Sequence, residues 1–336
     1  MQHIINAEQF DTVQLAEIFM EADYFREHDS SIVDRRDVTA AHTGRIVLTQ
    51  FYEPSTRTRF SFEAAATKLG IGVVSTENAS VTSSAVKGEG IEDTVRVFNE
   101  YGVDAIVLRT KEDGHALRAA NVSDTAIING GDGKGEHPTQ SVLDMYTIYE
   151  QLNRLEGINV VMAGDLAHGR TVRSLSRLLS LYPNNHITFL STPELQIGED
   201  IKAYLTERGT SFEETGDMHG ALREADVAYW TRLQLERHNG NSASLGQEHF
   251  IFDETALAVL PKHAIIMHPL PRVTEIPTST DLDPRAKYFR QAGNGLYVRM
   301  ALLDRIMTSL DSAEEFSNPF SLKLSEDLAA QVAVAV

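Results

Sequence analysis

The fold class is indicated by Arg45-Ile-Val-Leu-Thr-Gln-Phe51, which runs directly into Tyr52-Glu-Pro-Ser-Thr-Arg-Thr-Arg59. The first part is apolar and β-branched, which predicts a buried strand that ends before Pro54. Ser55 stands where a helix N-cap belongs, and a helical pattern follows it. A strand that leads directly into a helix is typical of parallel α/β layers.

The same alternation of strand and helix continues along most of the chain. Strands are expected at residues 45–51, 72–75, 104–109 and 125–129, and then at 159–163, 187–190, 211–213, 227–230 and 264–268. Helices are expected at residues 57–69, 92–101, 138–151, 171–181, 199–208 and 295–310. The break between the two sets of strands falls around residues 151–157.

We therefore expect an α/β fold of two domains, each a parallel β-sheet flanked by helices. The expected limits are 1–150 for the first domain and 151–292 for the second. A length of 336 residues supports this division, because it exceeds what one hydrophobic core usually serves. Periodicity alone does not place the final helix, 293–310, which in this fold class is expected to pack back on the first domain.

Composition excludes several classes of function. The chain has no cysteine, which rules out a disulfide framework, a thiolate metal site and a cysteine nucleophile, and fits a cytoplasmic location. A formal net charge of −18 argues against nucleic acid or an anionic membrane as a partner. No apolar stretch approaches the ~20 residues that a membrane helix needs. An acidic chain that binds anions must therefore do so with locally clustered cations.

Residues 55–59 are the first such cluster. Hydroxyls and two arginines fall in the first helical turn, where free N–H groups and a partial positive charge attract phosphate. Arg57 can add bidentate hydrogen bonds, and Thr56 and Thr58 can supply neutral donors. Taken alone, the stretch is explained about equally well as a capped surface helix with solvated arginines.

Further candidates follow later in the first half. Arg109 ends the apolar run that starts at Ala105, and ligands of open α/β sheets bind beyond the carboxyl ends of strands. In His137-Pro-Thr-Gln140, a histidine and a glutamine at the mouth of a helix can polarise a carbonyl group and hold an amide NH2. The stretch 83–90 can be a lid that carries Lys87 to an anionic substrate. Each feature alone has a plainer interpretation. Arg109 can be a solvated arginine, His137 a capping histidine, and the stretch 83–90 a solvent-exposed loop.

Three stretches of the second half each follow an apolar strand at its carboxyl end. They are Gly164-Asp-Leu-Ala-His-Gly-Arg170, Trp230-Thr-Arg232-Leu-Gln234 and His268-Pro-Leu-Pro-Arg272. Arginines on neighbouring loops at one sheet edge suit a site for carboxylates. Nucleotide binding is disfavoured, because the sequence has neither a G-x-G-x-x-G nor a P-loop pattern.

Taken together, the motifs at 55–59, 137–140 and 268–272 resemble those of the aspartate/ornithine carbamoyltransferases. Their order and spacing agree with that family from about Ile46 to Leu303. Any one of these motifs would be modest support for the resemblance, whereas the ordered set is highly specific.

Within the family, three features favour the aspartate enzymes. The loop Lys87-Gly-Glu and the stretch Thr231-Arg-Leu-Gln234 are similar to theirs. His268-Pro-Leu-Pro stands where the ornithine enzymes typically carry His-Cys-Leu-Pro. An ornithine pocket would offer a carboxylate to a side-chain ammonium, whereas these loops offer guanidinium groups.

The resemblance implies transfer of the carbamoyl group of carbamoyl phosphate to the α-amine of L-aspartate, as in de novo pyrimidine biosynthesis, without a metal or an organic cofactor. The residues that it implies for carbamoyl phosphate binding are Ser55, Thr56, Arg57, Thr58, Arg109, His137, Gln140, Pro269 and Leu270. Of these, Arg57, Thr58, Arg109 and His137 are the implied catalytic residues. The residues implied for aspartate binding are Lys87, Arg170, Arg232 and Gln234.

The resemblance also implies a homo-oligomer, usually a trimer. In this family, Ser83 and Lys87 match residues that reach the active site of the neighbouring subunit. Glu53 matches a residue whose ion pairs with Arg170 and Arg237 support domain closure. The sequence leaves open whether regulatory chains bind.

Three rival interpretations are weaker. The loops at Lys87 and Arg232 disfavour a carbamoyltransferase with ornithine or another acceptor. The intact set of Arg57, Arg109, His137 and Arg232 disfavours a catalytically silent homologue that binds anions or scaffolds other chains. A nucleotide-binding oxidoreductase is disfavoured because the glycine fingerprint is missing.

Overall fold

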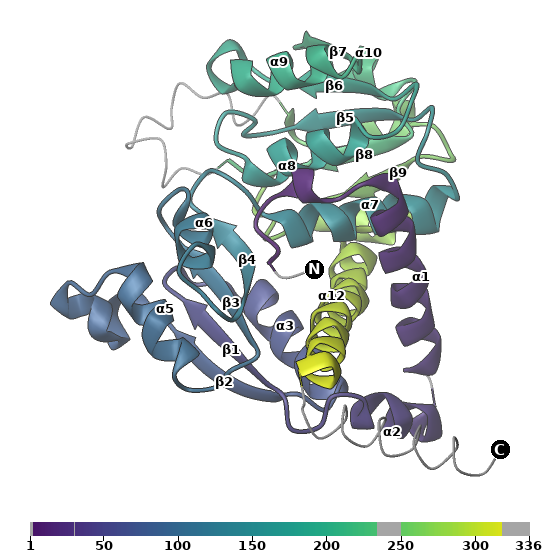
Figure 1. The fold of residues 1–336 in the computed structure, drawn as a ribbon. Helices are drawn as coiled ribbons and strands as arrows, with labels where there is room; N and C mark the ends of the chain where they lie inside the picture. Colours follow the sequence, from purple (N-terminus) through teal and green to yellow (C-terminus); the bar gives the residue numbers. More distant parts are fainter. Residues whose placement is uncertain (1–2, 30, 234–249, 318–336) are drawn as a thin grey trace.

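The structure is a computed structural model that describes residues 3–29, 31–233 and 250–317. Its strands form two separate parallel sheets (Figure 1), one of four strands in the order β2-β1-β3-β4 and one of five in the order β7-β6-β5-β8-β9. The strands of the first sheet are β1 (Ile46–Phe51), β2 (Gly72–Glu77), β3 (Ala105–Thr110) and β4 (Ala126–Asp132). Those of the second sheet are β5 (Asn159–Ala163), β6 (His186–Leu190), β7 (Ser211–Thr215), β8 (Val227–Trp230) and β9 (Ile265–Met267). The expected α/β fold with two parallel sheets is confirmed.

Helices connect the strands and cover both faces of each sheet. Around the first sheet they are α1 (Thr12–His28), α2 (Ile32–Ala40), α3 (Thr56–Lys68), α4 (Ala79–Thr82), α5 (Ile91–Asn99), α6 (His115–Ala120) and α7 (Pro138–Leu152). Around the second sheet they are α8 (Arg170–Leu179), α9 (Glu199–Glu207), α10 (Met218–Leu222) and α11 (Glu254–Val259), and α12 (Tyr288–Ser317) follows. Short 3-10 helices are η1 (Ala7–Gln9), η2 (Ser84–Lys87), η3 (Pro193–Leu195) and η7 (Thr278–Leu282). None of the helices in the described part of the chain is long and apolar enough to span a membrane.

The faces of the first sheet alternate in the way that strand geometry requires. On β3, Ala105 and Val107 join a core that includes residues of α1, α3, α7 and α12. Ile106 and Leu108 point to the other face and pack with residues of α5 and α6. Because both faces are covered, β3 is buried along its whole length and shows no polar alternation in its sequence.

The last helix joins the two halves of the molecule. α12 packs against α1, α3 and α7, so the expectation that it returns to the first domain is confirmed (Figure 1). It begins earlier than expected, at Tyr288, and extends to Ser317. Its buried residues belong to a hydrophobic cluster that also contains residues of β5 and α8, so the two units share part of one core.

The structure differs from the sequence predictions in two further places. The strand expected at 125–129 is longer, because β4 continues to Asp132, which pairs with Thr110 across an irregular register. α1 was not predicted, although Asp11 and Gln14 form a capping box at its start. Ahead of α1, Ile4 bridges to Ile128 and extends the sheet at its β4 edge.

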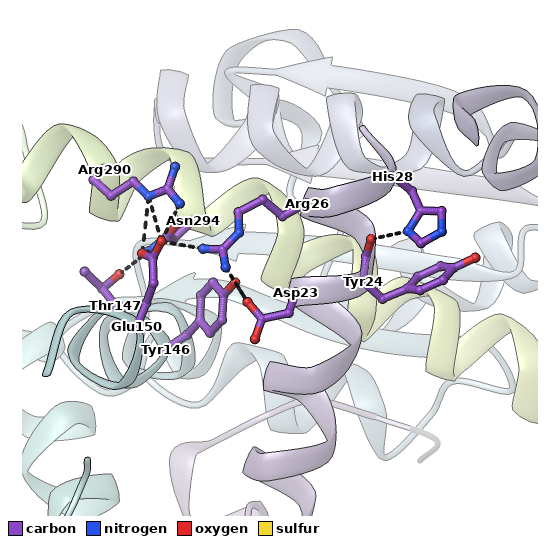
Figure 2. Close-up of polar contacts among 9 residues, drawn as sticks. All are labelled: Asp23, Tyr24, Arg26, His28, Tyr146, Thr147, Glu150, Arg290 and Asn294. Atoms are coloured by element: carbon purple, nitrogen blue, oxygen red, sulfur yellow. Dashed lines mark hydrogen bonds and ion pairs between the residues drawn. The ribbon is translucent and has the colours of Figure 1, made fainter. Parts of the chain in front are cut away.

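Near the carboxyl end of α7, Glu150 takes part in a cluster of ion pairs and hydrogen bonds (Figure 2). The Glu150 carboxylate accepts hydrogen bonds from Arg290 Nε at 3.0 Å and Asn294 Nδ2 at 2.7 Å, and pairs with Arg26 of α1. Burial alone would raise the pKa of Glu150, but the hydrogen bonds from Arg290 and Asn294 and the charges of Arg290 and Arg26 hold it below its usual range. One carboxylate therefore ties α7 to both α1 and α12.

The substitution Glu150→Gln should lower the free energy of unfolding by about 2 kcal/mol at neutral pH, because it weakens charge-assisted hydrogen bonds to three partners. A group with a depressed pKa stabilises above its unfolded-state pKa, so the difference from wild type should shrink as the pH falls through the folded-state pKa of Glu150. Urea denaturation at several pH values measures it, with the exposed Glu207→Gln as the matched control. Equal loss in both variants would contradict this role.

Candidate active site

A cavity of about 600 Å³ lies where the carboxyl ends of both sheets meet. Its lining residues follow β1, β3, β4, β5, β8 and β9, and a further group comes from α12. The lining includes Glu53, Ser55, Thr56, Arg57, Thr58, Ser61, Arg109, His137, Gln140, Arg170, Thr171, Thr231, Arg232, His268, Pro269, Leu270, Gln291 and Arg299. The location is the one that open parallel sheets use for ligands, beyond the carboxyl ends of their strands.

The amino terminus of α3 forms one wall of this cavity. Ser55 occupies the N-cap position in an extended conformation, with φ −157° and ψ 91°. In the described chain, the Ser55 side chain makes no capping hydrogen bond, so it does not occupy the first N–H groups of the helix. Desolvation, and then the charge of Arg232, lower the pKa of Arg57. Arginines of the two units are therefore close enough to repel each other, which an anion between them would relieve.

A second wall is formed by Arg109 and Arg170, which share Glu53. Glu53 Oε2 lies 3.0 Å from Arg109 Nη2 and 3.3 Å from Arg170 Nη2. Arg109 also donates to the carbonyl of Gly130 at 3.0 Å, and Arg170 to that of Gly133 at 2.8 Å. The carboxylate thus holds an arginine of the first unit beside one of the second.

Gly131 makes this close approach possible. Its φ is +117°, and a Cβ atom there would lie 2.8 Å from Arg109 Nη1 and 3.0 Å from Arg170 Cζ. A side chain at this position would both strain the backbone and displace the two guanidinium groups. The end of β4 is therefore shaped by the arginines that pack against it.

Thr58 and His137 lie next to each other in the cavity lining. Both are buried, and Thr58 Oγ1 lies 3.4 Å from His137 Nε2. The backbone N–H of His137 donates to Ser174 Oγ at 3.2 Å, which fixes the start of α7. Burial, followed by the charges of Arg170, Arg109 and Arg299, holds the pKa of His137 well below its ordinary value. The imidazole is therefore neutral at pH 7 and can donate a hydrogen bond without competing with the arginines for a negative charge.

The loop after β9 completes the cavity on the side of the second unit. His268 Nδ1 accepts a hydrogen bond from the N–H of Leu270 at 2.8 Å, so its other ring nitrogen carries the proton. That nitrogen, Nε2, lies 2.8 Å from Glu275 Oε1 and donates to it. Leu270 has φ +51°, which turns the chain sharply over the cavity. The side chains of Arg232 and Arg170 lie in the same lining.

Most of the residues that the sequence predicted for substrate binding lie together in this one lining. Ser83 and Lys87 do not, because Ser83 lies between α4 and η2 and Lys87 ends η2, in the segment that projects ahead of α5 (Figure 1). Lys87 is exposed there. Gln234 and Arg237 lie outside the described residues, so only the pairing of Glu53 with Arg170 is confirmed from the expected closure network. The pairing of Glu53 with Arg109 was not expected.

Two side chains of α12 that line the cavity, Gln291 and Arg299, were not predicted from the sequence. Arg299 is 3% exposed, and burial lowers its pKa to about 10 against the opposing charge of Asp144. A detectable signal existed, because Arg299 is a charged residue between the buried Val298 and Met300 of an apolar helix. A charge at such a position is costly unless it has a partner or a function.

The arrangement suits a small molecule with several negative charges. Five arginines line the cavity, at positions 57, 109, 170, 232 and 299, and Glu53 is the one carboxylate in the lining that the structure describes. The described residues contain no cluster of histidine, aspartate and glutamate side chains that could hold a metal ion. Neutral donors, Thr58 and His137, lie among the cations, where they can face a carbonyl oxygen that becomes negative.

Comparisons with known proteins agree with this geometry. Residues 2–150 match the carbamoyl-P binding domain of aspartate/ornithine carbamoyltransferase, and residues 156–306 match the Asp/Orn binding domain of the same family. The chloroplastic aspartate carbamoyltransferase of Oryza sativa subsp. japonica is 49% identical over 90% of this chain and 84% of that protein. The aspartate carbamoyltransferase catalytic subunit of Clostridium kluyveri is 39% identical over 91% of this chain and 98% of that protein.

Solved structures of aspartate transcarbamoylases are also similar to this chain. Aspartate transcarbamoylase from Trypanosoma cruzi, in complex with N-(phosphonacetyl)-L-aspartic acid, superposes with a TM-score of 0.83 at 34% identity, over 90% of this chain and 95% of that chain. The catalytic subunit of M. jannaschii aspartate transcarbamoylase gives 0.82 at 39% identity, over 92% and 99%. Fold, lining residues and relatives lead to one conclusion: the chain belongs to the aspartate/ornithine carbamoyltransferase family.

Proposed function

We propose that this chain transfers the carbamoyl group of carbamoyl phosphate to the α-amine of L-aspartate, a step of de novo pyrimidine biosynthesis. The observation that carries the proposal is that one cavity joins the anion-binding helix start of the first unit to Arg170 and Arg232 of the second. The ligand of the T. cruzi neighbour combines a phosphonate with an aspartate, which is the pair of anionic groups that this cavity would hold.

The phosphate is assigned to the start of α3. Ser55, Thr56 and Thr58 offer hydroxyls and backbone N–H groups, and Arg57 offers a bidentate guanidinium. Arg109 lies at the end of β3 beside this turn and can bridge the phosphate and the carbamoyl oxygen. As the phosphate leaves, its growing charge is stabilised by cations that are already in place.

The carbamoyl oxygen is assigned to Thr58, Arg109 and His137. The unprotonated α-amine of aspartate attacks the carbamoyl carbon, and a tetrahedral intermediate with a negative oxygen forms. The intermediate collapses when the bond from the carbamoyl carbon to the phosphate oxygen breaks, and the proton that the attacking amine loses passes to the departing phosphate. Because His137 is held neutral, it can stabilise that oxygen as a hydrogen-bond donor but is a poor general acid.

The remaining groups of the two substrates have their own partners. The carbamoyl NH2 is assigned to Gln140 and to the backbone of Pro269 and Leu270. The α-carboxylate of aspartate is assigned to Arg170, and its side-chain carboxylate to Arg232 with Gln234 and the neighbouring subunit's Lys87. Holding two anionic substrates together supplies much of the acceleration, since the uncatalysed encounter is opposed by charge repulsion.

The substitution Arg57→Ala should reduce turnover about 10²–10³-fold and weaken carbamoyl phosphate binding, because it removes a preorganised bidentate donor. Formation of carbamoyl-aspartate by the purified oligomer measures turnover. The exposed Arg223→Ala, outside the cavity, is the matched control and should behave as wild type. Near-normal turnover of Arg57→Ala would refute the assignment.

We further propose that the active unit is a homotrimer in which Ser83 and Lys87 complete the site of the next subunit. Two observations support this arrangement. Lys87 is exposed and is not among the described residues that line its own cavity. Val74 of β2, Val81 of α4 and Val86 of η2 are large apolar side chains that are 53%, 63% and 62% exposed. An apolar surface on an edge strand and the helices that follow it suits burial against a second copy.

Subunit mixing tests this arrangement. Lys87→Ala and Arg57→Ala oligomers should each be inactive, yet after dissociation and joint reassembly they should regain about a quarter of wild-type activity. The reason is that each mixed cyclic trimer contains one site with a native Arg57 and a native Lys87 from its neighbour. Mixtures that stay inactive, although mass spectrometry shows mixed trimers, would place Lys87 in its own subunit's site.

Two further features remain proposals. The domain limits are proposed at 1–150 and 151–292, on the basis that α7, which ends at Leu152, is the last helix before the second sheet. A cytoplasmic location is proposed on the cysteine-free composition, whereas the plant relatives are named as chloroplastic. Fractionation of the source cells tests that location.

A further inference from the structure

We propose that Asp144 is a positioning residue. It orients neighbouring groups so that one end of the cavity offers only hydrogen-bond acceptors, and this end then selects the NH2 group of the acyl phosphate. Asp144 lies on α7, behind the cavity lining, and is fully buried. The inference rests on the proposed function, in which the substrate carries such an NH2 group. It concerns how the chain distinguishes that group from a methyl group of similar size.

The Asp144 carboxylate collects three hydrogen-bond donors from three elements. Gln140 Nε2 of α7 donates to its Oδ1 at 2.8 Å, and Gln291 Nε2 of α12 donates to the same oxygen at 2.6 Å. Tyr229 of β8 donates its hydroxyl to Oδ2 at 2.8 Å. Burial raises the pKa of Asp144 to about 6, against these hydrogen bonds and the charge of Arg299, so the group is mostly ionised at neutral pH. An ionised carboxylate can only accept.

One consequence concerns Gln140, which lines the cavity. A glutamine amide has one donor end and one acceptor end, and without a neighbour either end can face a ligand. Because Asp144 accepts only, it takes the Nε2 end of Gln140. The Oε1 atom is then the end that remains for a ligand, and it is an acceptor.

The loop after β9, which Asp144 reaches through Gln291, presents acceptors as well. Asp144 also takes the Nε2 end of Gln291, whose Oε1 accepts the backbone N–H of His268 at 2.8 Å. The N–H of Leu270 is used by His268 Nδ1, and Pro269 has no N–H. Along this loop, the backbone groups that remain for a ligand at Pro269 and Leu270 are therefore carbonyl oxygens, which are acceptors as well.

The amide of Gln140 and the loop after β9 therefore favour the same kind of ligand group. The acceptors at this end of the cavity are Gln140 Oε1 and the carbonyls of Pro269 and Leu270. They suit a ligand group with two N–H donors. Opposite a methyl group or another acceptor, these oxygens would have no hydrogen-bond partner. A site whose buried polar groups are left unpaired rejects the analogue strongly. Acetyl phosphate is such an analogue, because it keeps the phosphate and the carbonyl and replaces NH2 by CH3.

The test measures the preference for carbamoyl phosphate over acetyl phosphate, as the ratio of their dissociation constants by calorimetry. Asp144→Ala should reduce this ratio about tenfold, mainly through weaker carbamoyl phosphate binding. Asp144→Asn should keep most of it, because its Oδ1 can still accept from both glutamines while Tyr229 rotates its hydroxyl. The matched control is Tyr229→Phe, which removes the third donor and leaves both glutamines in place.

The outcomes separate three explanations. A purely structural role of Asp144 would weaken both ligands equally, because both bind through phosphate, and an unchanged ratio in folded Asp144→Ala would overturn the proposal. If that variant does not fold, Gln291→Leu cuts one arm of the same network and should lower the ratio severalfold, and an unchanged ratio there overturns the proposal as well. If wild type itself shows no preference and no carbamoyl transfer, the proposed function fails instead.

Discussion

The constraint on which the rest of the structure depends is the convergence of five arginines on one cavity in a chain whose net charge is −18. Like charges at such distances repel, and burial adds the cost of desolvation. The fold offsets this with Glu53, which pairs with Arg109 and Arg170, and with Asp144, whose charge opposes the lowered pKa of Arg299. The remaining positive potential is available for anionic substrates, which relieve the repulsion when they bind.

The scaffold converts this electrostatic arrangement into geometry. Parallel sheets bring the carboxyl ends of their strands to one edge, so residues far apart in sequence meet there without long loops. α7 and α12 then fix the orientation of what lines the cavity. Asp144 and Glu150 lie on α7 and accept hydrogen bonds from side chains of α12. Asp144 accepts from Gln291, and Glu150 accepts from Arg290 and Asn294. The same helix pair therefore holds the two units together and orients the amide end of the site.

Much of this could be predicted from sequence, because the strands are continuous apolar runs and the motifs follow their ends. The structure accordingly brings Ser55, Arg109, His137 and Arg170 together in the lining of one cavity. Asp144 and Arg299 could not be assigned a role, since the Gln291 partner of Asp144 lies 147 positions away and both depend on how α12 packs. Only the family resemblance assigned Lys87 to the site of a neighbouring subunit. Lys87 is absent from the lining described for its own chain, and no local sequence pattern could predict that.

The most direct test of the central claim is carbamoyl transfer by the purified oligomer, with L-aspartate and L-ornithine offered in parallel at equal concentration. Carbamoyl-aspartate and no carbamoyl-ornithine should form, because the acceptor side of the cavity presents Arg170 and Arg232 and no carboxylate beyond the paired Glu53 among its described lining residues. Product with ornithine alone would be consistent with the assigned phosphate site and would contradict the assignment of Arg170 and Arg232 to aspartate. No product with either acceptor, from an oligomer that still binds carbamoyl phosphate, would contradict the catalytic claim itself.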